Sequence, residues 1–319
     1  MTMTFASRRS FLQLGFSAAG AALVPRWTWA QATAGQQNAA AQDDPGKVQV
    51  KSTRLGDHVF LLQGVGGNMA LQTGSDGLLL IDASYAPAVP RIREAIASLV
   101  PTPPSAPSQL INTHWHLDHT GGNEGLHDAG FAILAHRQTR DRLSHAQEMK
   151  LFHRTVGPSP AGALPTQIFD STMTVFRNGD TLDMVHFAPA HTDSDIYIHF
   201  KNANVLHLGD IWFNGMYPFI DEGTGGNIDG MIAGSKLALE LADGSTKIIP
   251  GHGPLGTKQE LAAYHEMLSA VREKVALLKK QGLSEQEALA KKPTAEFDAR
   301  WGKGFMAPDV FVGIVYRTV

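Results

Sequence analysis

The sequence predicts an α/β fold in which two packed β-sheets carry helices on their outer faces. Short apolar runs of β-prone residues gather in two sets, one between residues 58 and 135 and the other between residues 173 and 249. Segments whose apolar residues recur at helical spacing flank both sets. Because a sheet buries its apolar face against another layer, this order of elements indicates two packed sheets with helices outside.

The first set of elements ends near residue 149. Val89, Ile92, Ile96 and Leu99 recur at three- and four-residue intervals and predict a helix. A continuous apolar run that ends at Asp82 has the composition of a buried strand. The full expectation is strands at 58–63, 68–73, 78–81, 109–112 and 131–135, and helices at 87–100, 120–128 and 136–149.

The second set contains two long connections as well as strands and helices. The segment 151–167 contains glycines and prolines at several positions, so an irregular loop is predicted there, and the segment 211–227 is a second, aromatic-rich loop. The remaining expectation is strands at 173–176, 181–187, 195–200, 204–208 and 246–249, and helices at 228–241, 257–281, 283–291 and 307–316.

Residues 1–32 are predicted to be an export signal of the twin-arginine type. The pair Arg8-Arg9 precedes an apolar run that is shorter than the ~20 residues that a membrane span needs. A small-x-small cleavage site follows at 30–32. We therefore expect a periplasmic protein that meets the twin-arginine translocase during export and has no stable membrane insertion.

The rest of the chain is predicted to be a short linker and one domain. Residues 33–47 are small and polar, as in a flexible linker, and the domain is expected over 48–319. The formal net charge is −3, which gives no electrostatic basis for nucleic-acid binding. The chain has no cysteine, so disulfides and thiolate metal ligands are excluded.

A dense group of metal-ligand side chains follows the predicted strand at 109–112. His114, His116, Asp118 and His119 form a His-x-His-x-Asp-His run. A strand end places the first two histidines on one side, and the turn that follows directs Asp118 and His119 the other way. Nitrogen and oxygen ligands without thiolate suit zinc best, with iron or manganese as the alternatives.

This run resembles the signature of the metallo-β-lactamase superfamily, and the resemblance extends over about residues 50–255. Asp82 matches the first motif of the family, His191 the third, Asp210 the fourth and His252 the fifth. The resemblance implies an αββα sandwich, in agreement with the element pattern.

The resemblance also implies a ligand set for two zinc ions. His114, His116 and His191 would hold the first ion, Asp118, His119 and His252 the second, and Asp210 would bridge them. Two such ions hold a hydroxide that acts as the nucleophile, and Asp118 would orient it. Asp82 is expected to orient a ligand histidine from outside the ligand set.

The residues after Asp210 are predicted to contact the substrate. Apolar side chains with one polar neighbour suggest a pocket wall, and packing of this loop onto the core is an equally weighted alternative. The wall would contain Trp212, Phe213, Asn214, Met216, Tyr217 and Phe219. The loop 151–167 is expected opposite.

The predicted function is a periplasmic dizinc hydrolase of a small cyclic or activated ester, thioester or amide, with weak β-lactamase or lactonase activity as one form. An aspartate at 210 resembles glyoxalase II and lactonases, whereas the best-known β-lactamases have cysteine there. Phe213 stands where many β-lactamases have a carboxylate-binding lysine. The alternatives are a mono-iron persulfide dioxygenase of the same fold and a zinc-dependent binding protein with a vestigial site.

Overall fold

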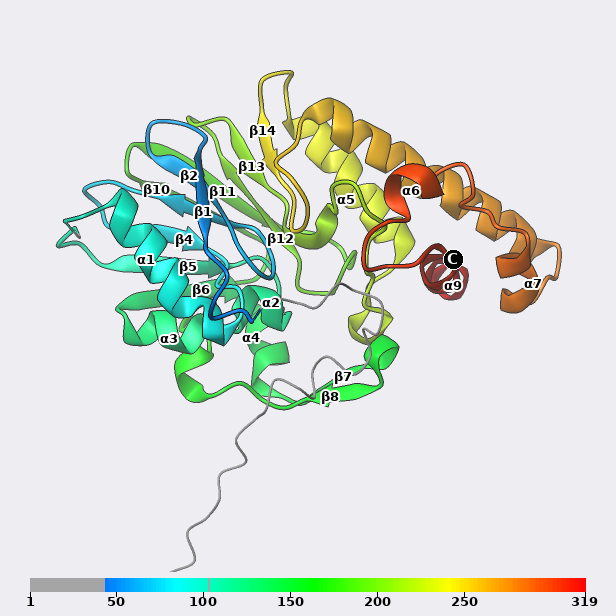
Figure 1. The fold of residues 1–319 in the computed structure, drawn as a ribbon, viewed down its shortest axis with the longest axis horizontal. Coiled ribbons are helices and arrows are strands. Elements are labelled where there is room, and N and C mark those ends of the chain that lie inside the picture. The colour runs from blue at the N-terminus through cyan, green and yellow to red at the C-terminus, as the bar shows by residue number, and fades with distance from the viewer. Residues whose placement is uncertain (1–43, 103) are drawn as a thin grey trace, which may run out of the picture. The chain divides into compact units, whose positions relative to one another are not determined.

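The computed structural model describes residues 44–102 and 104–319. The predicted export signal at 1–32 and most of the predicted linker at 33–47 lie outside these residues. Everything described belongs to one unit, Ala39–Val319 (Figure 1). No helix within the described ranges combines the length and apolar character needed to cross a bilayer.

The first sheet places Asp82 and His114 at one edge. Its strands β1 to β4 pair antiparallel, whereas β4, β5, β6 and β9 pair parallel. Asp82 follows β4 directly and His114 follows β5 by two residues, so both lie past the carboxyl ends of parallel neighbours. The order is β1 (Lys51–Arg54), β2 (Val59–Gln63), β3 (Met69–Gln72), β4 (Leu79–Ile81), β5 (Ser108–Asn112), β6 (Phe131–His136) and β9 (Gln167–Phe169).

The second sheet delivers the remaining ligand candidates. His191 lies between β11 and β12, Asp210 follows β13, and His252 follows β14, which pairs parallel with β13. The other neighbours in this sheet pair antiparallel. The order is β10 (Thr172–Arg177), β11 (Asp180–His186), β12 (Ile196–Phe200), β13 (Val205–His207) and β14 (Lys247–Ile249).

The two sheets pack face to face, as the sequence predicts. Side chains alternate along each strand: Leu61 and Ile111 lie in the cluster between the sheets, whereas Leu62 and Leu110 lie in the cluster on the outer face. The second sheet contributes inward side chains such as Ile198 to the same central cluster. This confirms the αββα sandwich.

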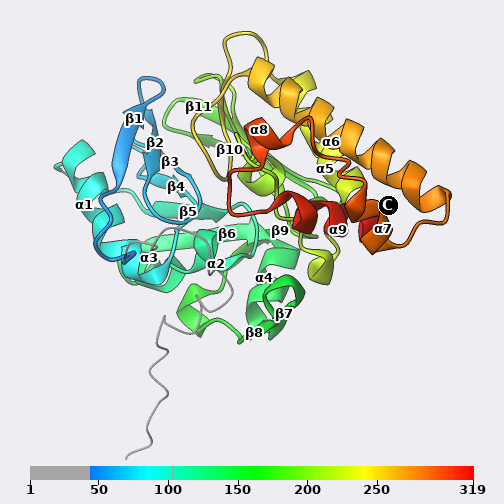
Figure 2. The ribbon, with the colours of Figure 1, turned by 45° about the vertical axis from the view of Figure 1, so that its right-hand side comes forward.

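Helices cover both outer faces (Figures 1 and 2). The helices α1 (Val89–Leu99) and α3 (Asn123–Asp128) pack on the first sheet. The helices α5 (Ile228–Leu241) and α6 (Lys258–Lys280) pack on the second, and α9 (Pro308–Thr318) packs against these two helices. The shorter elements are α2 (Leu117–Thr120), α4 (Arg137–Ser144), α7 (Glu285–Ala290), α8 (Asp298–Trp301) and 3₁₀ turns at Ala86–Ala88, Lys150–Phe152, Ala161–Ala163, Gly209–Ile211 and Glu222–Thr224.

The segment after β6 differs from the prediction. The expected helix at 136–149 ends at Ser144, because the Gln147 amide donates hydrogen bonds to the carbonyls of Arg142 and His145. The chain then forms a hairpin of β7 (Gln147–Met149) and β8 (Arg154–Val156), which we call the β7–β8 hairpin. The predicted irregular loop at 151–167 was therefore wrong in its first part, which is regular.

Candidate metal centre

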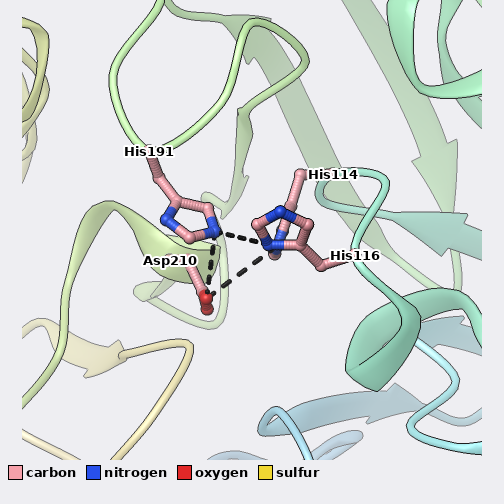
Figure 3. A group of neighbouring side chains, drawn as sticks. All are labelled: His114, His116, His191 and Asp210. Carbon is pink, nitrogen blue, oxygen red and sulfur yellow. Dashed lines mark hydrogen bonds and ion pairs between the residues drawn. The ribbon is translucent and has the colours of Figure 1, made fainter. Parts of the chain in front are cut away.

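The structure brings the seven predicted ligands together in two groups. One contains His114, His116, His191 and Asp210, and the other contains Asp118, His119 and His252. In each group, ligand atoms of all members lie within 4.8 Å of one another. Figure 3 shows the first group, with His191 and Asp210 facing the two histidines that follow β5.

In the first group, nitrogen lone pairs point at one another. The Nε2–H of His116 donates to Asp221 Oδ2 at 3.1 Å, and the Nδ1–H of His191 donates to the Phe219 carbonyl at 2.7 Å. The remaining nitrogens, His116 Nδ1 and His191 Nε2, are therefore unprotonated and lie 2.8 Å apart. Two facing lone pairs at this distance repel each other, so a shared proton or a metal ion bound by both nitrogens would stabilise the pair.

His114 adds a third unprotonated nitrogen. Its Nδ1 lies 3.0 Å from Thr113 Oγ1, which itself donates to Asp82 Oδ2 at 2.8 Å, so the His114 Nδ1–H must be the donor. This leaves His114 Nε2 as a buried atom without a hydrogen-bond partner. Asp210 Oδ1 is also buried and makes no hydrogen bond, although His119 Nε2 lies 3.1 Å from it. Orphaned acceptors of this kind are expected where a metal ion binds.

The second group has the spacing of a metal shell. His252 Nε2 lies 3.1 Å from Asp118 Oδ2 and 3.4 Å from His119 Nε2. Ligands at the metal distances typical of zinc lie ~3.4 Å apart at the corners of a tetrahedron. The Nδ1–H of His119 donates to Asp82 Oδ2 at 2.7 Å, which directs its Nε2 lone pair inward.

Asp210 reaches both groups. Its Oδ1 lies 3.1 Å from His119 Nε2, and its Oδ2 lies 3.3 Å from His191 Nε2 and 3.4 Å from His252 Nε2. One carboxylate thus faces histidines of both sets, which is the arrangement of a bridging ligand.

The backbone around the centre is shaped for close approach. Asp82 has φ +63°, a strained conformation for a non-glycine residue, and it accepts hydrogen bonds from the Thr113 amide as well as from Thr113 Oγ1 and His119. A Cβ on Gly67 would collide with the His119 ring, and one on Gly251 would collide with Asp210 Oδ1. Both positions therefore require glycine.

Charge differs between the two groups. Burial lowers the pKa of His114 well below its usual value and lowers the pKa of His191 to about 4. Burial opposes protonation of His119 and His252 as well, but nearby carboxylates, Asp210 first, outweigh it. They hold the pKa of His119 well above its usual value and raise the pKa of His252 to about 9. Without ions, the second group therefore retains protons that a metal must displace.

Three orienting residues were not predicted from the sequence. Asp221 holds His116, and Thr113 connects His114 to Asp82. The Asp195 carboxylate accepts from the backbone N–H groups of His191 and Thr192, both at 2.8 Å, and fixes the loop that carries His191. Thr113 and Asp195 lie within four residues of His114 and His191 in the sequence, so their positions next to the motifs could have identified them. Asp221 lies in a loop with no local pattern.

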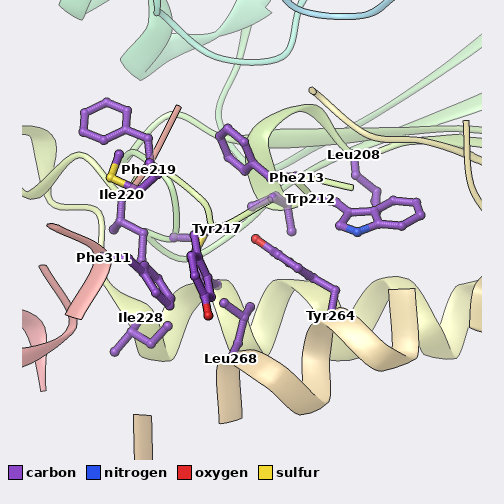
Figure 4. Packing of buried hydrophobic residues seen from close by; sticks show 14 of the residues in the cluster. Leu208, Trp212, Phe213, Tyr217, Phe219, Ile220, Ile228, Tyr264, Leu268 and Phe311 are labelled. Carbon is purple, nitrogen blue, oxygen red and sulfur yellow. The ribbon is translucent and has the colours of Figure 1, made fainter. Parts of the chain in front are cut away.

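The predicted pocket residues occupy two different environments. Trp212 and Tyr217 are 0% exposed and pack into the cluster under α6 and α9, where the Tyr217 hydroxyl donates to Asp298 (Figure 4). Phe213, in contrast, stacks on the His252 ring with centroids 5.2 Å apart. The backbone N–H of Asn214 donates to the His252 carbonyl at 2.9 Å, and its side-chain amide donates to the Pro254 carbonyl at 3.0 Å. The burial of Trp212 and Tyr217 supports packing rather than substrate contact.

Of the other two side chains of the predicted wall, Phe219 makes a ring contact with a ligand and Met216 makes none. Phe219 stacks on His116 with centroids 5.6 Å apart, and Met216 is partly exposed. Phe305, from the connection before α9, lies 6.1 Å from Phe213 and is 43% exposed. Phe213 and Phe305 thus form an aromatic contact beside His252, the more exposed histidine of the second group.

Comparison with known proteins identifies the family. The model of the family described as "Metallo-beta-lactamase superfamily" matches residues 62–253. This is more than half of the chain, so the chain belongs to the metallo-beta-lactamase superfamily. It is a hydrolase of that superfamily, with a histidine–aspartate cluster suited to divalent metal ions.

Similar proteins differ in what they act on. The acyl-coenzyme A thioesterase MBLAC2 of Gallus gallus is 24% identical over 223 residues, 62% of this chain and 78% of that protein. A hydroxyacylglutathione hydrolase of Gloeobacter violaceus is 31% identical over 121 residues, 36% of this chain and 38% of that protein. The structure of the inverting sec-alkylsulfatase Pisa1 from Pseudomonas sp. matches with a TM-score of 0.65 at 18% identity. That match covers 84% of this chain and half (50%) of the sulfatase chain, and it shows the fold alone.

Proposed function

We propose that this protein is a dinuclear zinc hydrolase that cleaves a thioester or a similarly activated ester. The observation that carries the proposal is the position of Asp210, whose two oxygens face His119 on one side and His191 on the other, at 3.1 and 3.3 Å. A site for a single ion would leave either His252 or His114 without a coordination role. Zinc is favoured because all donors are imidazole nitrogens or carboxylate oxygens, with iron or manganese as alternatives.

The relatives support the choice of bond. The thioesterase and the hydroxyacylglutathione hydrolase are both named for cleavage of an acyl group from a thiol. A thioester is also more activated than an alkyl ester or an amide. Lactones and β-lactams, which the sequence equally allows, serve as the comparison substrates.

The residues of the chain divide the work. The seven ligands would hold two divalent ions, which would supply acidification of a bound water and polarisation of the acyl carbonyl. Asp118, whose side chain is 21% exposed, lies at the open side, where its carboxylate orients the water and accepts its proton. Without ions, the charges of His119 and His252 hold the pKa of Asp118 below its usual value against the effect of burial. In the loaded enzyme the positive charge of the metal ions would keep this carboxylate ionised instead. Phe213 and Phe219 exclude bulk water beside the ligands.

The test is a substrate panel on protein of measured metal content. Zinc-loaded protein should hydrolyse acyl thioesters faster than lactones, β-lactams and alkyl esters, and chelated protein should be inactive until zinc is returned. Oxygen uptake with glutathione persulfide is measured alongside. Oxygen consumption without thioester cleavage would contradict the hydrolase proposal and support a mono-iron persulfide dioxygenase instead.

We also propose that the mature protein acts in the periplasm. The support is the Arg8-Arg9 motif, which lies outside the described residues. Replacing both arginines by lysine should leave precursor in the cytoplasm in a cell-fractionation assay. An undiminished periplasmic yield would contradict the export route.

A further inference from the structure

One cation near the metal centre has no hydrogen-bond or ion-pair partner within residues 44–102 and 104–319. The Arg154 side chain makes no ion pair with any described residue, and its Nε is buried without a hydrogen-bond partner. Neighbouring arginines behave differently, since Arg142 pairs with Asp193 at 2.6 Å and Arg137 with Asp170 at 2.5 Å. An unpaired guanidinium that is partly buried is costly, so its retention calls for a partner that binds from outside.

The β7–β8 hairpin that carries Arg154 is tied to the loop of His191. The amide of Gln147 at the start of the hairpin donates to the Arg142 carbonyl, and Arg142 Nη1 donates back to Gln147 Oε1 at 3.0 Å. The same Arg142 pairs with Asp193, two residues after His191. The hairpin is therefore held in a fixed position relative to the first group of ligands.

A second contact joins the hairpin to the first group of ligands through Phe219. Phe152, in the turn of the hairpin, lies 5.3 Å from Phe219, which in turn stacks on His116 at 5.6 Å. The hairpin main chain also approaches Gly223, where an added Cβ would meet the Glu148 carbonyl. Gly223 follows Asp221, the residue that orients His116, by two positions.

Arg154 and two carboxylates of the metal centre affect the pKa of the same side chain, Tyr85. Burial raises the pKa of the Tyr85 phenol, the charge of Asp118 raises it further, and the Arg154 guanidinium opposes both. Asp210 adds a smaller effect in the same direction as Asp118. One phenol thus lies within electrostatic reach of Arg154 and of both ligand carboxylates.

We propose that Arg154 binds an anionic group of the substrate, a carboxylate or a phosphate, and so selects anionic thioesters. The proposal rests on the proposed thioester hydrolysis. A guanidinium offers two parallel N–H donors to a carboxylate or a phosphate, which fixes the orientation of the ligand as well as its position. Bound there, the anion neutralises the unpaired charge, and the acyl carbonyl extends toward Asp118 and His252 at the exposed side of the centre.

The experiment compares thioesters that differ only in charge. The first pair is the neutral hexanoyl and the anionic adipoyl thioester of thiophenol, which differ by a carboxylate. The second pair is neutral acetyl-pantetheine and acetyl-coenzyme A, which differ by the nucleotide with its phosphates. Loss of a hydrogen bond to a charged group corresponds to about a 10- to 100-fold effect. We therefore expect Arg154→Met to raise KM by about that factor for one anionic substrate, with KM for its neutral partner unchanged. For the anionic substrate, the KM of Arg154→Lys should lie between those of the wild type and Arg154→Met.

Lys150 offers a matched control on the same hairpin. It is exposed, so Lys150→Met removes an equal charge without removing a buried donor and should change KM less than about threefold, as for a solvated charge. Equal effects of the two variants would show that net charge alone steers the substrate and would overturn the role of Arg154. Equal KM of the wild type for neutral and anionic partners would overturn it as well.

A binding measurement separates this proposal from the proposed function. Calorimetry with adipate and with adenosine 3′,5′-bisphosphate follows anion binding to zinc-loaded protein without turnover. If no thioester is cleaved but Arg154→Met still abolishes binding of one anion, the hydrolase proposal fails and the anion site stands. If thioesters are cleaved and neither anion binds more weakly to the variant, the anion site fails alone.

Discussion

The two halves of the metal centre are built differently. In the first half, His114, His116 and His191 are at most 5% exposed, and the outward nitrogen of each ring is held by a fixed partner. In the second half, His119 is equally buried, but the side chains of Asp118 and His252 are 21% and 20% exposed. The first half is thus enclosed by protein, and the second faces solvent.

This difference indicates a division of function. An enclosed set of imidazoles whose outward nitrogens have fixed partners favours tight metal binding, since the lone pairs are oriented before the ion arrives. The open side, next to Phe213 and Asp118, is where substrate can approach. The protonated state of His252, whose pKa is raised to about 9 by Asp210 and Asp118 against the effect of burial, makes the second half the weaker binding site.

The largest expected effect comes from the residue that belongs to both halves. Asp210→Asn keeps the side-chain shape but removes the charge that faces His119, His191 and His252. Loss of a residue that only hydrogen-bonds to a metal ligand lowers metal affinity by about 10–100-fold. Loss of a ligand shared by both ions should therefore lower the zinc affinity of both halves by more than about 100-fold. Elemental analysis after dialysis measures it. Retention of two ions would show that Asp210 does not bridge.

A smaller effect should distinguish the halves. Asp221 holds only His116, whereas Asp82 holds His119 directly and His114 through Thr113. Asp221→Asn should therefore weaken only the first site, and Asp82→Asn should weaken both, each by about 10–100-fold. Zinc titration against a chromophoric chelator resolves the two affinities. Identical titration curves for the variants would contradict the assignment of the orienting residues.

The sequence could predict those site residues that belong to short sequence patterns. The His-x-His-x-Asp-His run and the strand ends at Asp82 and Asp210 are short patterns, and the structure places all of these residues together. Asp221 could not be found in this way, because its contact with His116 joins residues 105 positions apart. Only the folded chain brings that loop over the ligand.

The smallest expected effect concerns the aromatic residues after Asp210. Tyr217→Phe removes the hydrogen bond from the Tyr217 hydroxyl to Asp298 in the cluster under α9 and should lower the free energy of unfolding by about 1–2 kcal/mol. Zinc content and KM should stay at wild-type values, since the side chain is 0% exposed. A raised KM at unchanged stability would restore the pocket role that the sequence suggested.

The rest of the fold shows the same limit of prediction. Periodic apolar residues located α1, α5 and α6 within two residues of their observed ends. The β7–β8 hairpin was missed, because the strand β7 is only three residues long and the Gln147 side chain, rather than a proline or glycine, ends the helix before it. Whether Trp212 faces substrate or core depends on the packing of α6, which no local pattern specifies.

The most direct test of the two-half centre is the stoichiometry and release of zinc. Protein purified without chelator should contain about two zinc ions per chain, and a chelator should remove one much faster than the other. His252→Ala should abolish the fast phase and leave the slow one, since it alters only the open half. One ion per chain, or two ions released at one rate that His252→Ala does not change, would contradict the account.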